Sequence, residues 1–295
     1  MDQLTIQAPL LWLALGSAAL MALIGSNDDE SSVAPEPEAD PEPFEDAPGY
    51  DPSRFGEERI GTTGDDALTA DPGTASAIAG LDGDDRVNGS DQADYVLGGE
   101  GDDTISGANG ADSLRAGAGE DVIDGGEDND VILGEAGDDS LAGGTGADRI
   151  IGGAGNDVLS GLGQSRAAPS SLSESLEDRG DTLLGGMGDD TLWISAEDTA
   201  TGGEGADLFA VDHRVLQPGD PAMITDYTPG DDAVVVYVRS SFDSASGGLV
   251  APELRAIGNA AGGYTTILAD DVPVARVEGV TDPALIDLRR VVDDL

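Results

Sequence analysis

The chain has 295 residues, a formal net charge of −47 and no cysteine, and all 13 of its basic residues are arginine. With no basic patch to neutralise phosphates, unaided nucleic-acid binding is excluded, and without cysteine there are no disulfides or thiolate metal sites. So large a negative charge predicts strong self-repulsion in the absence of divalent cations.

The N-terminal region combines an apolar segment with an acidic one. Residues 10–24 read LLWLALGSAALMALI, which is long for a buried helix and short for a full membrane span. No basic residue precedes this segment, and no clear cleavage site follows it. We therefore expect residues 1–25 to be a membrane anchor or a signal segment, and both alternatives place the rest of the chain outside the cytoplasm. Residues 26–59 are acidic and rich in proline, which predicts a disordered linker.

From Gly80 to Ser160 the chain repeats itself every nine residues, nine times and without a gap. The shared pattern is G-G-x-G-x-D-x-U-x, where U is a large aliphatic residue. A disordered Gly/Asp-rich tract has no reason to hold one apolar residue in phase, so the pattern indicates a fold. The sixth position is Asp in every unit: Asp85, Asp94, Asp103, Asp112, Asp121, Asp130, Asp139, Asp148 and Asp157.

This composition of the repeat is suited to binding calcium. A glycine-rich turn exposes carbonyl groups and adopts positive φ at little steric cost. Calcium takes six to eight oxygen ligands, and one turn with its Asp supplies about half of them, so a stacked copy of the turn can supply the rest. The three residues around position eight predict a short strand whose central aliphatic side chain points into the core.

The array resembles the RTX (haemolysin-type) calcium-binding family, which has this repeat signature. The resemblance implies an all-β parallel β-roll in which two units form one coil. It also implies several bound Ca²⁺ ions in two columns and a type I-like exporter that reads an uncleaved C-terminal signal. One column would contain Asp85, Asp103, Asp121, Asp139 and Asp157, and the other Asp94, Asp112, Asp130 and Asp148.

The two columns are not expected to be equal. The fourth position is always Gly in the first column, whereas the second column has Gln92 and Asp128 at this position. If the turn requires positive φ there, Gln and Asp adopt it at a cost. We therefore expect the first column to bind calcium more tightly.

The repeat phase extends beyond the uninterrupted block. Further units contribute the candidate metal ligands Asp66, Asp181, Asp190 and Asp207, with a Ser-rich excursion at Gln164–Arg179. The roll is therefore predicted over residues 60–210. Residues 211–295 contain separate apolar runs and are predicted to form a β-rich cap, with a hairpin that turns at Asp270–Asp271.

Motifs for catalysis are missing from the sequence. It contains no H-E-x-x-H, no G-x-S-x-G and no Walker loop, and its single histidine, His213, has no second histidine to act with. We therefore predict a non-enzymatic, extracellular or surface-tethered protein whose roll folds on binding Ca²⁺ after export. Residues 10–24 would provide any membrane association, and nothing in the sequence indicates an oligomeric state.

Two alternatives remain open. One is a secreted adhesin that uses outward-facing apolar residues of the roll, namely Tyr95, Val122, Val131 and Val158. The other is an enzyme with an unrecognised site in the C-terminal region or in the Gln164–Arg179 excursion.

Overall fold

The computed structural model describes residues 50–162, 180–213, 220–239, 241–243 and 248–293. The apolar segment 10–24, most of the expected linker and the excursion at 164–179 lie outside these residues. The described part consists of strands, connecting turns and two short 3-10 helices, Pro52–Arg54 and Pro283–Leu285. In these described ranges no helix is both long enough and apolar enough to cross a lipid bilayer.

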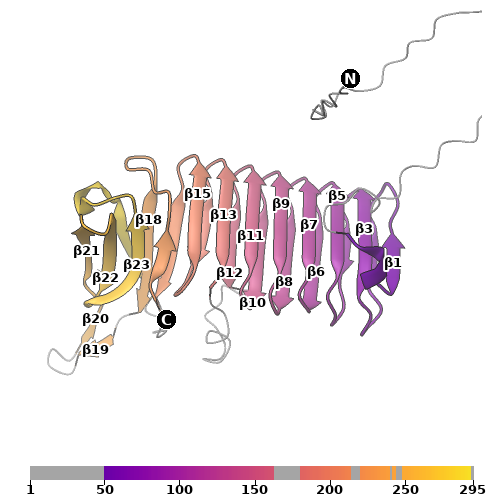
Figure 1. Ribbon diagram of the computed structural model, residues 1–295, viewed down its shortest axis with the longest axis horizontal. Helices are drawn as coiled ribbons and strands as arrows, with labels where there is room; N and C mark the ends of the chain where they lie inside the picture. The colour runs from indigo at the N-terminus through magenta and orange to yellow at the C-terminus, as the bar shows by residue number, and fades with distance from the viewer. Residues whose placement is uncertain (1–49, 163–179, 214–219, 240, 244–247, 294–295) are drawn as a thin grey trace, which may run out of the picture. The chain divides into compact units, whose positions relative to one another are not determined.

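Two long sheets build the molecule, and successive strands of the repeat region alternate between them (Figure 1). The first sheet contains, in spatial order, β1 (Glu57–Ile60), β3 (Ser76–Asp82), β5 (Tyr95–Glu100), β7 (Ser113–Ala118), β9 (Val131–Ala136), β11 (Arg149–Ala154), β13 (Thr182–Met187), β15 (Thr199–Glu204), β17 (Ala222–Ile224), β23 (Val272–Glu278), β22 (Tyr264–Ala269) and β21 (Leu254–Asn259). The second contains β2 (Ala67–Thr69), β4 (Arg86–Asn88), β6 (Thr104–Asn109), β8 (Val122–Glu127), β10 (Ser140–Thr145), β12 (Val158–Leu162), β14 (Thr191–Ile194), β16 (Leu208–His213), β18 (Ala233–Arg239) and β24 (Leu288–Asp293). A small antiparallel pair, β19 (Ser241–Asp243) and β20 (Gly248–Val250), is separate from both sheets.

The strand register confirms the predicted parallel β-roll. Ile105 pairs with Ile123, and Ile123 pairs with Leu141, so each coil advances by two nine-residue units. Across the gap in the described residues, Leu159 pairs with Leu192 in the same register. The residues between these two strands therefore do not disturb the stacking of the coils.

The core of the roll consists of one row of large aliphatic side chains from each sheet. The position-eight residues of the nine units are at most 1% exposed, and the stack continues through Leu183, Leu192 and Phe209. The strands are longer than the expected three residues, because pairing continues from position seven through the glycines into the next turn, as in β6. Glycine leaves the backbone there free to lie close to its neighbour.

The two sheets continue into the C-terminal region. β17 pairs in parallel with β15 and β23, and β18 pairs in parallel with β16 and β24. The first sheet then ends in the antiparallel strands β22 and β21. The hairpin between β22 and β23 turns at Asp270 and Asp271, both at positive φ, as predicted. The division into domains at 59/60 and 210/211 stays a prediction; its second boundary lies inside β16.

The expected outward-facing apolar patch does not exist as one surface. Tyr95 is only 2% exposed, because Tyr50 and Phe55 pack against it with ring-centroid distances of 5.6 and 6.2 Å. Val122 and Val131 are both exposed, but they belong to different sheets. Chain segments outside the repeat and the alternation of strands between sheets therefore separate residues that looked equivalent in the sequence.

Candidate metal centre: two aspartate columns

The position-six aspartates stack along each edge of the roll in a hydrogen-bonded ladder. The backbone N–H of each aspartate donates to Oδ1 of the aspartate one coil later; the Asp85 N–H to Asp103 Oδ1 distance is 2.8 Å. The first column contains Asp66, Asp85, Asp103, Asp121, Asp139, Asp157, Asp190, Asp207 and Asp232. The second begins at Ser76 and contains Asp94, Asp112, Asp130, Asp148, Asp181 and Asp198.

All thirteen aspartates predicted as metal ligands lie in these columns, and their role as ligands stays a prediction. Sequence reasoning missed Asp198 and Asp232. Asp232 carried a detectable signal, because Gly230, Asp232 and Val234 keep the spacing of positions four, six and eight. Asp198 follows a shortened unit, and Ala200 takes the buried position-eight place after it.

Most of the column aspartates have a second carboxylate oxygen, Oδ2, that is buried and accepts no hydrogen bond. The column aspartates of the nine units are 1–2% exposed, so water does not solvate them. A buried carboxylate oxygen without a hydrogen-bond partner is unfavourable unless a cation neutralises it. Oδ2 has no hydrogen-bond partner in eight of these nine aspartates, nor in Asp190 and Asp207, which are equally buried: Asp85, Asp103, Asp112, Asp121, Asp130, Asp139, Asp148, Asp157, Asp190 and Asp207.

Seven of these oxygens lie near a backbone carbonyl, at a place where a Cβ added to the first glycine of the unit would meet both atoms: those of Asp85, Asp103, Asp112, Asp130, Asp139, Asp157 and Asp190. A Cβ at Gly98 would lie 2.3 Å from Asp103 Oδ2 and 2.5 Å from the carbonyl oxygen of Ala116. A Cβ at Gly107 would meet Asp112 Oδ2 and the Gly125 carbonyl oxygen at the same two distances. Carboxylate and carbonyl oxygens therefore converge at these seven turns, and these are the ligands that calcium takes.

The described residues contain no group of three His, Asp or Glu side chains close enough to bind a metal ion on their own. Successive carboxylates in a column belong to successive coils. A calcium ion in a column would therefore need backbone carbonyls to complete its ligand set.

The turn backbone has two positions at positive φ, the second and the fourth. Glycine occupies most of them, but Leu81, Ala108 and Glu135 adopt φ of 78–89° at position two. Asp128 adopts φ 78° at position four, as expected for a tolerated but strained residue. Gln92 is not at positive φ, so the strain expected there is absent and the 89–94 turn has a different conformation.

The pKa values of several column aspartates are raised well above the usual value of a carboxyl group. Burial raises the pKa of Asp103 to about 7 and that of Asp112 to about 8, and repulsion from neighbouring aspartates adds to the effect. Burial likewise raises the pKa of Asp130, Asp139 and Asp190 to about 7 and that of Asp148 to about 6. Without a cation, these groups resist carrying negative charge at neutral pH.

A second ladder follows the outer side of the first column at position five. Here Asp102 Oδ1 accepts from the N–H of Glu120 at 2.9 Å, and Asp138 Oδ1 accepts from the N–H of Asn156 at 2.8 Å. In the second-column units of the uninterrupted block, this position is alanine except at Asn129, which accepts from the N–H of Ala147. Sequence reasoning treated position five as variable and solvent-facing; the residues are exposed, but in the first column they link successive turns.

Comparison with known proteins agrees with this geometry. The RTX calcium-binding nonapeptide repeat model matches four copies, at residues 77–105, 106–141, 133–165 and 178–193. One similar solved structure is the solution structure of the AlgE6R3 subunit from the Azotobacter vinelandii mannuronan C5-epimerase. It is 23% identical over 55% of this chain and 77% of that chain, with a TM-score of 0.31. No curated protein matches the chain. Residues 77–165 and 178–193 therefore match the RTX calcium-binding nonapeptide repeat, and the repeat region of the chain is similar to that family.

Proposed function

We propose that this is an exported calcium-binding protein whose roll folds when Ca²⁺ enters the two aspartate columns. The observation that carries the proposal is the buried Oδ2 oxygen without a partner, repeated coil after coil beside a backbone carbonyl. Asp181 occupies the equivalent place in the second column and joins these residues as a proposed ligand. Bound calcium supplies positive charge between stacked turns, and the chain's own residues supply the oxygens.

The energy balance of the roll supports a requirement for calcium. Each nine-residue unit contributes one large aliphatic side chain to the core, so little apolar burial is available to offset the entropy of ordering the coils. The buried carboxylates oppose folding further when they are charged. A divalent cation removes this repulsion and satisfies the free oxygens at the same time.

A location outside the cytoplasm suits such a protein. Extracellular calcium modules work with dissociation constants of about 10⁻⁴–10⁻³ M, so a roll of modest affinity would fill only after export. Residues 10–24 are the proposed tether or signal, and a type I-like exporter is the proposed route. No catalytic group is assigned to the repeat array, and the proposed role is binding.

Far-UV circular dichroism tests the folding proposal directly. In calcium-free buffer the protein should give mostly a coil spectrum, and millimolar Ca²⁺ should produce a β spectrum. Mg²⁺ at the same concentration is the control for charge screening, because it demands a smaller octahedral site and should not restore the fold. A chain that is β-rich and unfolds cooperatively without calcium would contradict the proposal.

Cell fractionation tests the role of the N-terminal segment. Deleting residues 1–25 should release a soluble protein that still gains β structure with calcium. If the shortened chain stays in the membrane fraction, another part of the protein holds it there.

A further inference from the structure

The ends of the two aspartate columns differ from the turns between them. At Asp66 and Asp94, where the columns begin, Oδ2 accepts a hydrogen bond from the backbone N–H of Thr62 or Ser90, each at 2.6 Å. Where the columns end, Asp198 Oδ2 accepts from the N–H of Ser195 at 2.6 Å, and Asp232 Oδ2 accepts from the N–H of Thr228 at 2.7 Å. All four donors are Ser or Thr, three or four residues before the aspartate.

The backbone of these end turns is also different. Thr62 and Ser90 occupy position two, but neither is at positive φ, whereas Leu81 and Ala108 directly after them in the columns adopt φ of 89° and 80°. The change in conformation turns the amide of the Ser or Thr toward its own aspartate. We call the turns of Asp66 and Asp94 closed, because Oδ2 accepts the amide of position two and that residue is not at positive φ. The turns with a free Oδ2, such as those of Asp85 and Asp112 with positive φ at position two, are called open.

Closure withdraws the carboxylate from the place where oxygens converge elsewhere. A Cβ at Gly61 or Gly89 would lie 2.9 or 2.8 Å from Oδ2 of Asp66 or Asp94. In the open turns the corresponding distance is 2.0–2.3 Å. In these two turns Oδ2 therefore lies farther from that point than in the open turns, while it accepts the amide hydrogen bond.

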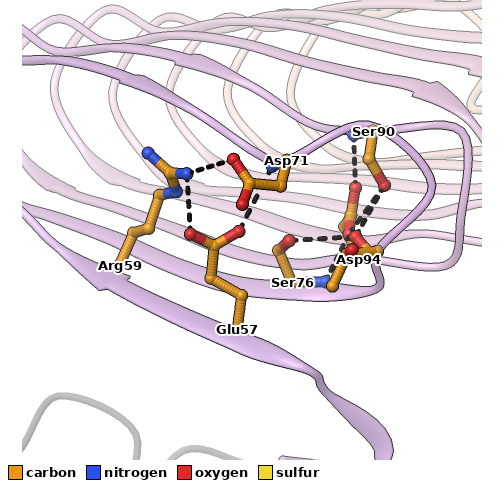
Figure 2. Close-up of polar contacts among 7 residues, drawn as sticks. Glu57, Arg59, Asp71, Ser76, Ser90 and Asp94 are labelled. Carbon is orange, nitrogen blue, oxygen red and sulfur yellow. Dashed lines mark hydrogen bonds and ion pairs between the residues drawn. The ribbon is translucent and has the colours of Figure 1, made fainter.

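Asp94 shows how completely an end carboxylate is satisfied (Figure 2). Its Oδ1 accepts from the N–H of Ser76 at 2.6 Å, and its Oδ2 accepts from the N–H of Ser90. The Ser76 and Ser90 hydroxyls both donate to the carbonyl oxygen of Thr74, each at 3.0 Å. Nearby, Arg59 forms ion pairs with Glu57 and Asp71 and ties β1 to the loop between β2 and β3.

We propose that the four Ser/Thr–Asp turns are metal-free caps that end the calcium columns. This inference rests on the proposed calcium-binding function of the open turns. An amide N–H supplies the partial positive charge that Ca²⁺ would supply elsewhere, and it occupies one of the two lone pairs of the Oδ2 oxygen that it engages. The caps satisfy the last carboxylates of each column, where no further aspartate turn stacks to complete a site. They also give the roll ends that can hold their conformation before calcium binds, as terminal caps do in other solenoids.

Calcium stoichiometry separates caps from sites. Asp94→Asn and Asp112→Asn alter neighbouring turns of the same column, and both aspartates are 2% exposed. Bound calcium per chain is measured by equilibrium dialysis at saturating Ca²⁺, with circular dichroism on the same samples. Asp112→Asn should lose at least one ion relative to the unaltered protein, and Asp94→Asn should lose none.

A second pair keeps the test decisive if an Asp94 variant does not fold. Asp66 is only partly buried, so Asp66→Asn perturbs the structure little, and its matched partner is Asp85→Asn in the next coil. Asp85→Asn should lose calcium and Asp66→Asn should not. Equal losses within either pair would overturn the proposed caps while leaving calcium binding intact. If the unaltered protein binds no calcium, the proposed function itself fails.

Discussion

The two edges of the roll are made from the same repeat but differ in charge and length. The first column extends from Asp66 to Asp232 and carries a second ladder of acidic and Asn side chains at position five. The second column ends earlier, at Asp198, and its position-five residues up to Asp148 are alanine except for Asn129. Because alternate units go to opposite edges, substitutions in every second unit accumulate on one edge. A sequence that looks uniformly repetitive therefore builds two chemically different binding edges.

A change of pH should affect both columns, and we expect it to have the largest effect on the stability of the calcium-free roll. The pKa values of the buried aspartates are raised above the usual value near 4, so the folded roll binds more protons than the unfolded chain between about pH 4 and pH 8. Stability of the calcium-free roll is therefore greatest below about pH 4 and is lost as the pH rises through these folded pKa values. Circular dichroism in resin-treated, calcium-free buffer should show more β structure at pH 4 than at pH 7.5.

Calcium should abolish that pH dependence near neutrality, because it replaces the protons. Binding should release protons into a weakly buffered solution at pH 6.5, and a pH indicator would detect them. Absence of acid-induced structure, together with absence of proton release, would show that the column carboxylates are already charged in the calcium-free fold.

Interior aspartates of the two columns should respond unequally to truncation. Asp139 in the first column is preceded by Gly137, whereas Asp130 in the second is preceded by the strained Asp128. Asp139→Ala should raise the calcium concentration at the folding midpoint several-fold more than Asp130→Ala, since it removes a ligand from the more regular and more acidic edge. Asp139 is chosen for the first column in place of Asp121, because the Asp121 unit begins with Ala116 and therefore lacks the glycine that leaves room beside Oδ2. A larger shift for Asp130→Ala would reverse the expected order of the columns.

Relief of backbone strain should give the smallest effect. Ala108 in the second column is exposed and has φ 80°, a region where alanine costs about 1 kcal/mol relative to glycine. Ala108→Gly should raise the free energy of unfolding in saturating calcium by about 0.5–1 kcal/mol. Ala118→Gly is the matched control, because Ala118 is also exposed but is not at positive φ, and it should be neutral or destabilising. Urea denaturation of the two variants decides between these outcomes.

The nine-residue period was enough to predict the strands, the inward aliphatic residues and the thirteen stacked aspartates. Each of these depends on local pattern: the glycines set the turn, and strand alternation directs Ile105 inward and Thr104 outward. Pairing of every second unit followed from the family resemblance, and the register confirms it. Asp232 could have been found in the same way, because its unit keeps the spacing.

Other features depend on what lies against a residue in the folded chain. Tyr95 is buried because Tyr50 and Phe55 reach it from outside the repeat. Asp94 and Asp112 occupy the same position of the motif, yet one accepts the amide of Ser90 at Oδ2 and the other keeps that oxygen free. The sequence determined where the carboxylates of the in-phase units stand along the roll, because that is a matter of period; Asp198, after a shortened unit, was not found in this way. Only the tertiary structure decided which oxygens remain free for a cation, because hydrogen bonding at each turn depends on its own backbone conformation and on the coil stacked against it.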